Sequence, residues 1–280
     1  RLWVDAYGQL GLGDATNRNT FTAVPALPDG KVTKQVVAGR SHTMILAEDG
    51  TVFACGWNAY GQLGLGDTND RNTFTAVPPL PDGKVAKHVI GGNAYTMILA
   101  EDGTVFACGW NGRGQLGLGD TTNRNTFTAV PALPGDKVAK EVIPGHSHTM
   151  ILAEDGTVFA CGSNGFGQLG LGDEDDRNTF TAAPALLDGK VAKQVIGGNA
   201  SSMILAEDGT VFACGNNARG QLGLGDNNHR NTFTAVPFFG ADHPGLVPWT
   251  SSISCYTFAA PAPPEAEEAE QSRPVTVTSP

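Results

Sequence analysis

Residues 61–67 read Gly-Gln-Leu-Gly-Leu-Gly-Asp, and this heptapeptide occurs five times in the chain. The copies begin at Gly8, Gly61, Gly114, Gly167 and Gly220, so each starts 53 residues after the previous one, as from 8 to 61. Self-similarity at a fixed period of this length is typical of repeat proteins, in which every copy is one supersecondary unit. The heptapeptide therefore sets the length of the unit from which the fold is built.

Two further segments recur in the same register. Met-Ile-Leu-Ala-Glu-Asp-Gly-Thr-Val-Phe-Ala-Cys-Gly starts at positions 44, 97, 150 and 203, and Arg-Asn-Thr-Phe-Thr-Ala starts at positions 18, 71, 124, 177 and 230. Around the second copy, the β-prone stretches 84–90, 96–100 and 104–108 predict three strands, and 74–77 fits a fourth. Asp102-Gly103 predicts a hairpin with a type I′ turn, because glycine accepts positive φ.

A sheet of four short strands cannot cover its own apolar faces, so neighbouring units must cover them. The apolar run 97–99 supports this arrangement, because a strand buried on both faces lacks polar alternation. In residues 61–67, we expect the two leucines to fill the gap between adjacent units. The sequence thus predicts an all-β fold, a β-propeller whose blades are four-stranded antiparallel sheets.

The fixed order of these segments resembles the regulator of chromosome condensation repeat family over residues 1–237. The resemblance lies in the hairpin from Met97, then Cys-Gly-Trp-Asn at 108–111, then Gly-Gln-Leu-Gly-Leu-Gly-Asp. Kelch propellers share the paired glycines at 91–92 and 197–198 but not the Gly-Gln-Leu-Gly motif. The family implies a seven-bladed propeller.

This chain holds fewer units than the family implies. Four complete units span 29–81, 82–134, 135–187 and 188–237, and a partial unit, 1–28, is expected to supply the last two strands of a blade. Residues 238–260 resemble a degenerate repeat whose strands could close a five-bladed ring; the alternative, which the sequence favours, is a piece of a longer array with open edges. Residues 261–280 are rich in proline and glutamate and predict a disordered tail.

Composition limits the range of functions. The 280 residues carry a formal net charge of -10, which argues against binding nucleic acid or anionic lipid. No apolar run reaches the roughly 20 residues that cross a bilayer, and the first residues, from Arg1, do not form a secretory signal. Four of five cysteines share one repeat position, which indicates packing residues in a reducing compartment, the cytoplasm or nucleus.

Catalytic, metal and cofactor motifs find little support. The glycines of residues 61–67 do not have the spacing of a phosphate-binding loop. The acidic stretch 173–176 is interpreted as a solvated variant of a recurring turn instead of a calcium site, because Asp67 and Arg71 mark the same turn as a local ion pair. Candidate nucleophiles recur on successive units and do not converge. We therefore expect no enzyme activity, no cofactor and no metal.

A binding site on a nearly symmetric ring must use positions that differ between units. The positions flanking the loop before the heptapeptide vary and carry aromatic or arginine side chains, which are good interface anchors. They predict a partner-binding surface made of Trp57, Tyr60, Trp110, Arg113, Phe166 and Arg219. His42, Tyr95 and His148 share another repeat position, for which partner contact and a structural hydrogen bond are the two interpretations.

These observations favour a non-catalytic protein–protein interaction scaffold, which could be a module of a larger protein such as a ubiquitin ligase. The alternative implied by the resemblance is a guanine-nucleotide exchange factor for a small Ran-like GTPase, acting through a wedge-like insertion in one blade. The strict 53-residue spacing leaves no room for that insertion here. The expected partner is a protein, with a small GTPase as one candidate, and not a membrane.

Overall fold

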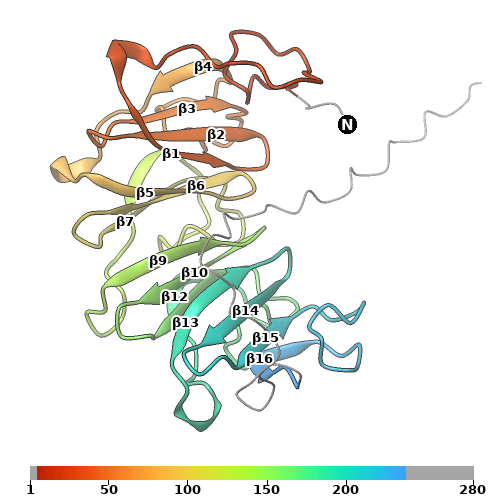
Figure 1. Cartoon of the computed structure of the whole chain (residues 1–280). Helices are drawn as coiled ribbons and strands as arrows, with labels where there is room; N and C mark the ends of the chain where they lie inside the picture. Colours follow the sequence, from red (N-terminus) through yellow and green to blue (C-terminus); the bar gives the residue numbers. More distant parts are fainter. Residues whose placement is uncertain (1–4, 238–280) are drawn as a thin grey trace, which may run out of the picture.

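The computed structural model describes residues 5–237, which form four sheets of four antiparallel strands each (Figure 1). The first two sheets consist of β1 (Thr33–Ala38), β2 (His42–Ala47), β3 (Val52–Gly56), β4 (Arg71–Ala76), β5 (Ala86–Gly91), β6 (Tyr95–Ala100), β7 (Val105–Gly109) and β8 (Arg124–Ala129). The last two consist of β9 (Ala139–Pro144), β10 (His148–Ala153), β11 (Val158–Gly162), β12 (Arg177–Ala182), β13 (Ala192–Gly197), β14 (Ser201–Ala206), β15 (Val211–Gly215) and β16 (Arg230–Ala235).

Each sheet uses four consecutive strands and is one blade of the propeller, here called blades 1 to 4. In Figure 1 the blades follow one another in chain order, and each packs face to face on the next. Each blade lies inside one of the four predicted complete units. The predicted all-β propeller fold is confirmed.

The Asp-Gly pairs of the hairpins form a different turn from the predicted one. In the first hairpin, Gly50 donates to the Ala47 carbonyl at 3.0 Å and has φ +85°, whereas Asp49 does not have positive φ. This pattern is a three-residue loop in which glycine follows a type I turn. The type I′ prediction is therefore wrong for these hairpins. Glycine is still favoured at this position, because Gly50 has positive φ.

Two consecutive positive φ values occur instead where one blade connects to the next. In η1 (Pro28–Gly30), Asp29 and Gly30 have φ 55° and 64°, close to a type I′ turn. The equivalent segments are η2 (Pro81–Gly83) and η3 (Leu187–Gly189). In the third unit the order is reversed to Gly135-Asp136, and both residues again have positive φ.

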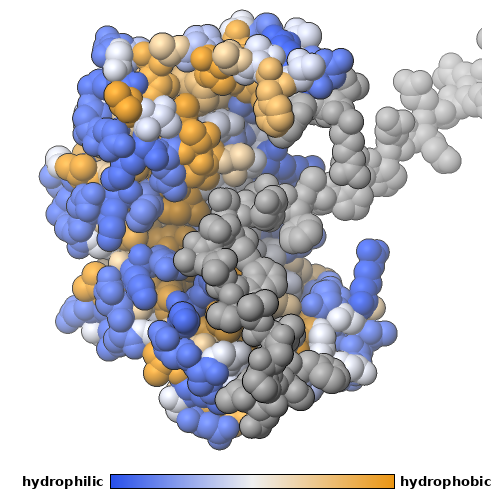
Figure 2. Space-filling view, in the orientation of Figure 1, coloured by the Kyte–Doolittle hydropathy of each residue, from blue (hydrophilic) through white to orange (hydrophobic). Residues whose placement is uncertain are grey.

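The core lies between blades and buries both faces of β6 and β10 and nearly all of β2, whereas β14 of the last described blade is fully buried on one face only. On β2, Met44 and Leu46 pack with Val89 and Ile98 of blade 2. The side chains that alternate with them, including Ile45, belong to a separate cluster on the opposite face. Burial on both faces explains why this stretch is continuously apolar in the sequence. In Figure 2, apolar side chains reach the surface between the blades, while hydrophilic side chains dominate the outer edges.

The heptapeptide joins neighbouring blades, as predicted. Leu63 is fully buried in the cluster shared by blades 1 and 2, and Leu65 forms a β-bridge to Thr126 of blade 2. Gly66 donates to the Asn125 carbonyl at 2.8 Å, and the Asn125 side chain returns a hydrogen bond to the Gly66 carbonyl at 2.9 Å. These contacts fasten the loop of one blade to the fourth strand of the next.

The partial unit packs on blade 1 through its heptapeptide but does not form the two expected strands within residues 5–28. Residues 18–23 repeat the sequence of β4, yet Phe21 is 93% exposed, whereas its equivalent Phe127 is 6% exposed. The fourth strand of a blade pairs with the third strand of the same blade, as β3 pairs with β4. Residues 5–28 contain no such third strand, so this sequence stays outside a sheet.

The two end blades expose positions that the inner blades bury. Val36 of β1 is 63% exposed, whereas its equivalent Val89 is 1% exposed. On the opposite end, Ile196 of β13 is 45% exposed, and its equivalent Ile143 is buried. The predictions for 238–260, as a degenerate repeat or closing strands, and for 261–280, as a disordered tail, fall outside the described residues.

Candidate protein-binding rim

The variable positions gather at one end of the blades. The start of β2 pairs with the end of β3, His42 with Gly56, so the turn after β1 and the loop after β3 lie at the same end. Trp57 donates its backbone N–H to the Ser41 carbonyl at 2.8 Å, which joins that turn to that loop. The same pairing recurs in the other blades, and we call this end of the molecule the rim.

A buried asparagine holds each rim loop. The Asn58 backbone N–H donates to Asp70 Oδ1 at 2.8 Å, and its side-chain amide donates to the Asp67 carbonyl at 3.1 Å. Asn58 Oδ1 accepts from the Leu63 N–H at 2.9 Å. The loop is therefore closed around one fully buried side chain. Asn111, Asn164 and Asn217 do the same, and sequence analysis overlooked them although they recur in register.

The predicted ion pair in the turn after the heptapeptide is confirmed. Arg71 Nη2 lies 2.6 Å from Asp67 Oδ2, and the same pair recurs in the other units. A hydrogen bond from the Asn69 N–H and the Arg71 guanidinium lower the pKa of Asp67. Both side chains are partly exposed, so the pair fixes the turn more than it stabilises the fold.

Three of the predicted partner-binding residues meet on the rim, together with a residue that the prediction did not include. The ring centroids are 5.8 Å apart for Tyr7 and Trp57, 5.2 Å for Trp57 and Tyr60, and 6.4 Å for Tyr60 and Trp110. Trp57 and Tyr60 meet edge to face at 81°. We call these four side chains the aromatic row; it crosses from the partial unit over blade 1 to blade 2.

Tyr7 could have been found from the sequence, because it occupies the repeat position of Tyr60. The equivalence is easy to miss, because the partial unit lacks the strands by which the complete units are aligned. Tyr7 and Tyr60 are 42% and 37% exposed, and both tryptophans are partly exposed. The aromatic row is therefore a surface feature.

The aromatic row forms one wall of a cavity of about 380 Å³, the rim cavity. Turn residues of blades 1 to 3 complete the lining: Arg40, Ser41, Asn93, Ala94 and His146. Burial and the neighbouring Arg40 charge lower the pKa of His146, whose Nδ1 lies 2.8 Å from the Ser147 hydroxyl. No aspartate or glutamate is among the residues that line this cavity, so its only permanent charge is positive.

The remaining predicted surface residues lie further along the rim and do not join the aromatic row. Arg113 is exposed and forms an ion pair with Asp176 of the next blade at 3.3 Å. Phe166 is 41% exposed and packs edge to face against His229 at a centroid distance of 5.2 Å. Arg219 is exposed on blade 4, and its backbone N–H donates to the Gln221 side chain. The same loop position thus carries an aromatic side chain on blades 1 and 3 and an arginine on blades 2 and 4.

His42, Tyr95 and His148 are interior residues, which corrects the interpretation of these side chains as partner contacts. His42 Nε2 lies 2.9 Å from the Thr96 hydroxyl of the next blade, and His148 Nε2 lies 3.0 Å from the Ser202 hydroxyl. The Tyr95 hydroxyl donates to the His148 carbonyl at 2.7 Å. Each side chain therefore joins its blade to the following one, and burial lowers the pKa of both histidines to about 4.

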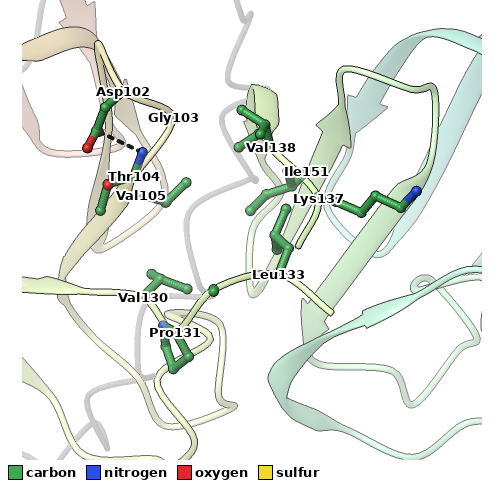
Figure 3. Close-up of a pocket in the computed structure, with 12 residues that line it drawn as sticks. Asp102, Gly103, Thr104, Val105, Val130, Pro131, Leu133, Lys137, Val138 and Ile151 are labelled. Atoms are coloured by element: carbon green, nitrogen blue, oxygen red, sulfur yellow. Dashed lines mark hydrogen bonds between the residues drawn. The ribbon is translucent and has the colours of Figure 1, made fainter. Parts of the chain in front are cut away.

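A second cavity, of about 230 Å³, opens at the opposite end between blades 2 and 3 (Figure 3). Figure 3 shows Val105 and Val130 of blade 2 facing Val138 and Ile151 of blade 3 across it. Asp102 lies at its edge, where its carboxylate accepts from the Thr104 N–H at 3.0 Å. The lining is mainly aliphatic, with Asp102, Thr104 and Lys137 as its side chains that carry polar or charged groups.

The repeated cysteines and the acidic stretch 173–176 make structural contacts. Cys55, Cys108, Cys161 and Cys214 are free and buried, as predicted, and burial raises the pKa of the Cys55 thiol to about 12. Within residues 5–237, no cluster of three or more histidine, cysteine, aspartate or glutamate side chains could hold a metal ion. In the acidic stretch, Asp173 and Asp176 each accept a hydrogen bond from Asn164 of the rim loop. Asp173 also pairs with Arg177, and Asp176 pairs with Arg113.

No helix within residues 5–237 is long and apolar enough to span a bilayer.

The fold and rim define a β-propeller repeat protein with a cavity at one end of its blades. The model of the regulator of chromosome condensation (RCC1) repeat matches residues 5–46, 49–99, 102–152, 155–205 and 208–255. The chain belongs to this family, as the sequence resemblance implied. A second model of the same repeat matches 33–62, 86–115 and 193–221.

Curated relatives include regulators of different kinds. The chain is 35% identical over 224 residues to the ultraviolet-B receptor UVR8 of Arabidopsis thaliana, covering 80% of this chain and 50% of that protein. It is 37% identical over 164 residues to the secretion-regulating guanine nucleotide exchange factor of Bos taurus, covering 59% and 35%. It is 35% identical over 211 residues to the probable E3 ubiquitin-protein ligase HERC3 of Homo sapiens, covering 75% and 20%. The chain thus spans half or less of the length of these relatives.

Solved structures agree on the fold. Human WBSCR16 superposes with a TM-score of 0.72 at 24% identity, covering 83% of this chain and 60% of that one. Yeast RCC1 (Prp20), solved bound to Kap60, gives 0.66 at 22% identity, covering 76% and 50%.

Proposed function

We propose that this protein is a non-catalytic interaction scaffold and that the aromatic row and the rim cavity bind its protein partner. The observation that carries the proposal is the gathering of Tyr7, Trp57, Tyr60 and Trp110 on one exposed wall. Tyrosine and tryptophan are enriched among the residues that dominate binding energy, because they bury large rigid surfaces and keep a polar group for hydrogen bonding.

The loops that carry this wall support the proposal. Asn58 and Asn111 close their loops with hydrogen bonds to backbone groups, so the aromatic side chains stand on an ordered frame. A site that is ordered before binding loses less conformational entropy when a partner docks. The repeat position of Tyr60 is occupied by Arg113, Phe166 and Arg219 in the other blades, so a partner can distinguish this part of the rim from the rest.

Non-catalytic action is part of the proposal. The buried thiols and imidazoles face neighbouring blades, and the rim cavity offers only Arg40 and His146 as charged or titratable side chains besides tyrosine. The free cysteines support a reducing compartment, the cytoplasm or nucleus, as the place where the scaffold acts.

A peptide library displayed on phage tests the binding site directly, because it presents many candidate sequences to the rim at once. We expect peptides selected on the wild-type chain to bind Tyr60→Ala at least tenfold more weakly. Phe166→Ala is the matched control, because it changes the same repeat position at similar exposure outside the aromatic row. The affinity of the selected peptides for Phe166→Ala should stay within twofold of their affinity for the wild-type chain. Equal binding to wild type and Tyr60→Ala would contradict the proposed site.

Nucleotide exchange on a small Ran-like GTPase is the second candidate, favoured by the exchange factor among the relatives. The 53-residue spacing of the four blades contains no insertion that could act as a wedge. Release of a fluorescent guanine nucleotide from a Ran-like GTPase tests it. Acceleration by the chain would replace the passive scaffold with an exchange factor, and an unchanged rate would leave the scaffold proposal standing.

A further inference from the structure

The chemistry of the rim cavity differs from that of the chain as a whole. The chain carries a formal net charge of -10, yet Arg40 and His146 line the cavity and no carboxylate is in its lining. Arg40 lies close enough to His146 for its charge to lower the pKa of that imidazole. A ligand that brings negative charge would therefore meet a complementary site in an otherwise acidic molecule.

The aromatic row adds a second requirement. Tyrosine and tryptophan side chains that line a groove are the common means of binding proline-rich segments, because proline rings pack flat on aromatic faces and little conformational entropy is lost. Trp57 and Tyr60 meet at 81°, and the other two ring pairs are tilted at 39° and 46°, so the row presents rings at several angles instead of one flat surface. A segment that carries both prolines and carboxylates therefore matches the aromatic and the basic side chains that line the cavity.

Such a segment is present in the same chain. Residues 261–270 read Pro-Ala-Pro-Pro-Glu-Ala-Glu-Glu-Ala-Glu and hold three prolines followed by four glutamates. We propose that residues 261–270 occupy the rim cavity, with the prolines on the aromatic row and the glutamates near Arg40. This inference rests on the proposed function of the rim as a binding site, and it names the chemistry that the site recognises.

The length of the chain permits this contact. Residues 238–260 separate the last described residue from the segment, and 23 residues can span up to about 80 Å. A compact body of about 230 residues has a radius of gyration of only about 17 Å. A segment of the same chain binds intramolecularly, so it competes with any free peptide of the same sequence. A partner with the same chemistry must displace it.

The experiment compares two full-length chains. In the tail variant, Glu265, Glu267, Glu268 and Glu270 are replaced by lysine; the other chain is wild type. The probe is a fluorescent synthetic peptide of residues 259–272, and binding is measured by fluorescence anisotropy at low salt. We expect the peptide to bind the tail variant at least tenfold more tightly than the wild type, because the natural segment competes for the cavity in the wild-type chain.

Site variants made in the tail variant locate the binding. Trp57→Ala and Arg40→Glu should each reduce peptide affinity at least tenfold, whereas Phe166→Ala should leave it within twofold. Raising the salt concentration to 0.5 M should weaken binding severalfold, since charge attraction contributes. The inference is overturned if the peptide binds the wild type and the tail variant with equal affinity. It is also overturned if Trp57→Ala and Arg40→Glu leave the affinity of the peptide unchanged.

Other occupants give distinct outcomes. If the segment inserts into a second copy, wild-type chains will dimerise with rising concentration and the tail variant will not, which overturns the contact within one chain. If library peptides depend on Tyr60 but the 259–272 peptide does not bind, the inference fails and the proposed function stands. If no peptide of either kind depends on the aromatic row, the proposed function fails as well.

Discussion

His42 and His148 are each enclosed between two blades, and their Nδ1 atoms have no hydrogen-bond partner in the described structure. Burial disfavours the imidazolium, which lowers the pKa of each to about 4, against an ordinary value of 6.5. The unfolded chain takes up a proton at each imidazole below pH 6.5, while the folded chain does so only near pH 4. The unfolded state thus binds more protons in this window, so stability falls as the pH is lowered through it.

We expect the free energy of unfolding to fall by about 2 kcal/mol per histidine between pH 7.5 and 5. His42→Tyr combined with His148→Tyr should remove most of this loss, because Tyr95 already fills the same repeat position between blades. Urea unfolding at several pH values measures the effect. The aspartates paired with lysine, such as Asp49 and Asp102, have a pKa of about 2 and titrate below this range.

Two results limit the interpretation of that pH dependence. His88 and His146 also have lowered pKa values, but His88 is exposed and His146 is partly exposed, so replacing them with asparagine should change the slope much less. A wild-type chain that is equally stable at pH 7.5 and pH 5 would contradict the buried, neutral state of His42 and His148.

At the residue scale, the sequence predicts which positions vary but not which way they face. Trp57, Tyr60 and Trp110 follow a strand end by one to four residues, and variation between units pointed to the surface correctly. His42 and Tyr95 also vary, yet they are buried. Their partners are Thr96 and the backbone of blade 3, which lie on other repeats. No local pattern in one unit records a contact made to the next.

At the scale of the element, the heptapeptide is a loop that only glycine can complete. Gly117 has φ +70°, and a Cβ there would lie 2.4 Å from the Phe180 ring and 3.3 Å from Cys161 Sγ. Gly119 has φ +88°, and its nearest neighbour, a methyl group of Thr179, lies 3.9 Å from the Cβ position. The two glycines share the backbone requirement and differ in the space around them.

This difference predicts unequal costs for the same substitution. Gly119→Ala should destabilise the chain by roughly 1–2 kcal/mol, the cost of positive φ for an alanine. Gly117→Ala should cost about 1–3 kcal/mol more, because the Phe180 ring must shift in a packed core. Urea unfolding of both variants measures the difference. If the two variants are destabilised equally, position 117 requires glycine because of its positive φ alone, and not because of the close contact with the Phe180 ring.

The elements themselves follow from the sequence more fully than their turns do. The strands β5 to β7 match the β-prone stretches of the second unit to within two residues, because each is short and holds β-branched, aromatic or apolar residues beside a glycine-containing turn. The sequence does not determine the type of the hairpin turn, since an Asp-Gly pair fits both a two-residue and a three-residue loop. The register decides between them: Ala47 donates to the Thr51 carbonyl, which leaves three residues in the loop.

At the scale of the whole molecule, the four blades form two close pairs joined by a different interface. A backbone hydrogen bond links blades 1 and 2, from the Arg40 N–H to the Gly92 carbonyl at 3.3 Å, and another links blades 3 and 4, from the His146 N–H to the Gly198 carbonyl at 3.1 Å. Between blades 2 and 3, no equivalent bond is present within residues 5–237, and the Tyr95 hydroxyl bonds to the Gly145 carbonyl instead.

One repeat position accounts for this difference. A Cβ at Gly91 or Gly197 would lie 2.8 Å from the backbone of the preceding blade, so glycine lets these blades approach closely. Pro144 occupies the same position in blade 3, where its ring needs that space. The aliphatic cavity of about 230 Å³ lies between the same two blades. In an array where each blade contacts its neighbours, the interface between blades 2 and 3 is thus the one most dependent on a single side chain.

Tyr95→Phe should therefore weaken the coupling between the two pairs. Loss of its hydrogen bonds, worth about 1–1.5 kcal/mol, should speed amide hydrogen exchange in β9 and β10 roughly tenfold, with smaller changes in β1 and β2. Ser202→Ala is the matched control: it removes the equivalent side-chain bond between blades 3 and 4, where the backbone bond from His146 remains. Exchange that rises equally in both variants would show that the backbone bonds do not divide the molecule into pairs. If exchange rises only in Tyr95→Phe, the Tyr95 hydroxyl holds blades 2 and 3 together, whereas a backbone hydrogen bond at a glycine position does so between blades 1 and 2 and between blades 3 and 4.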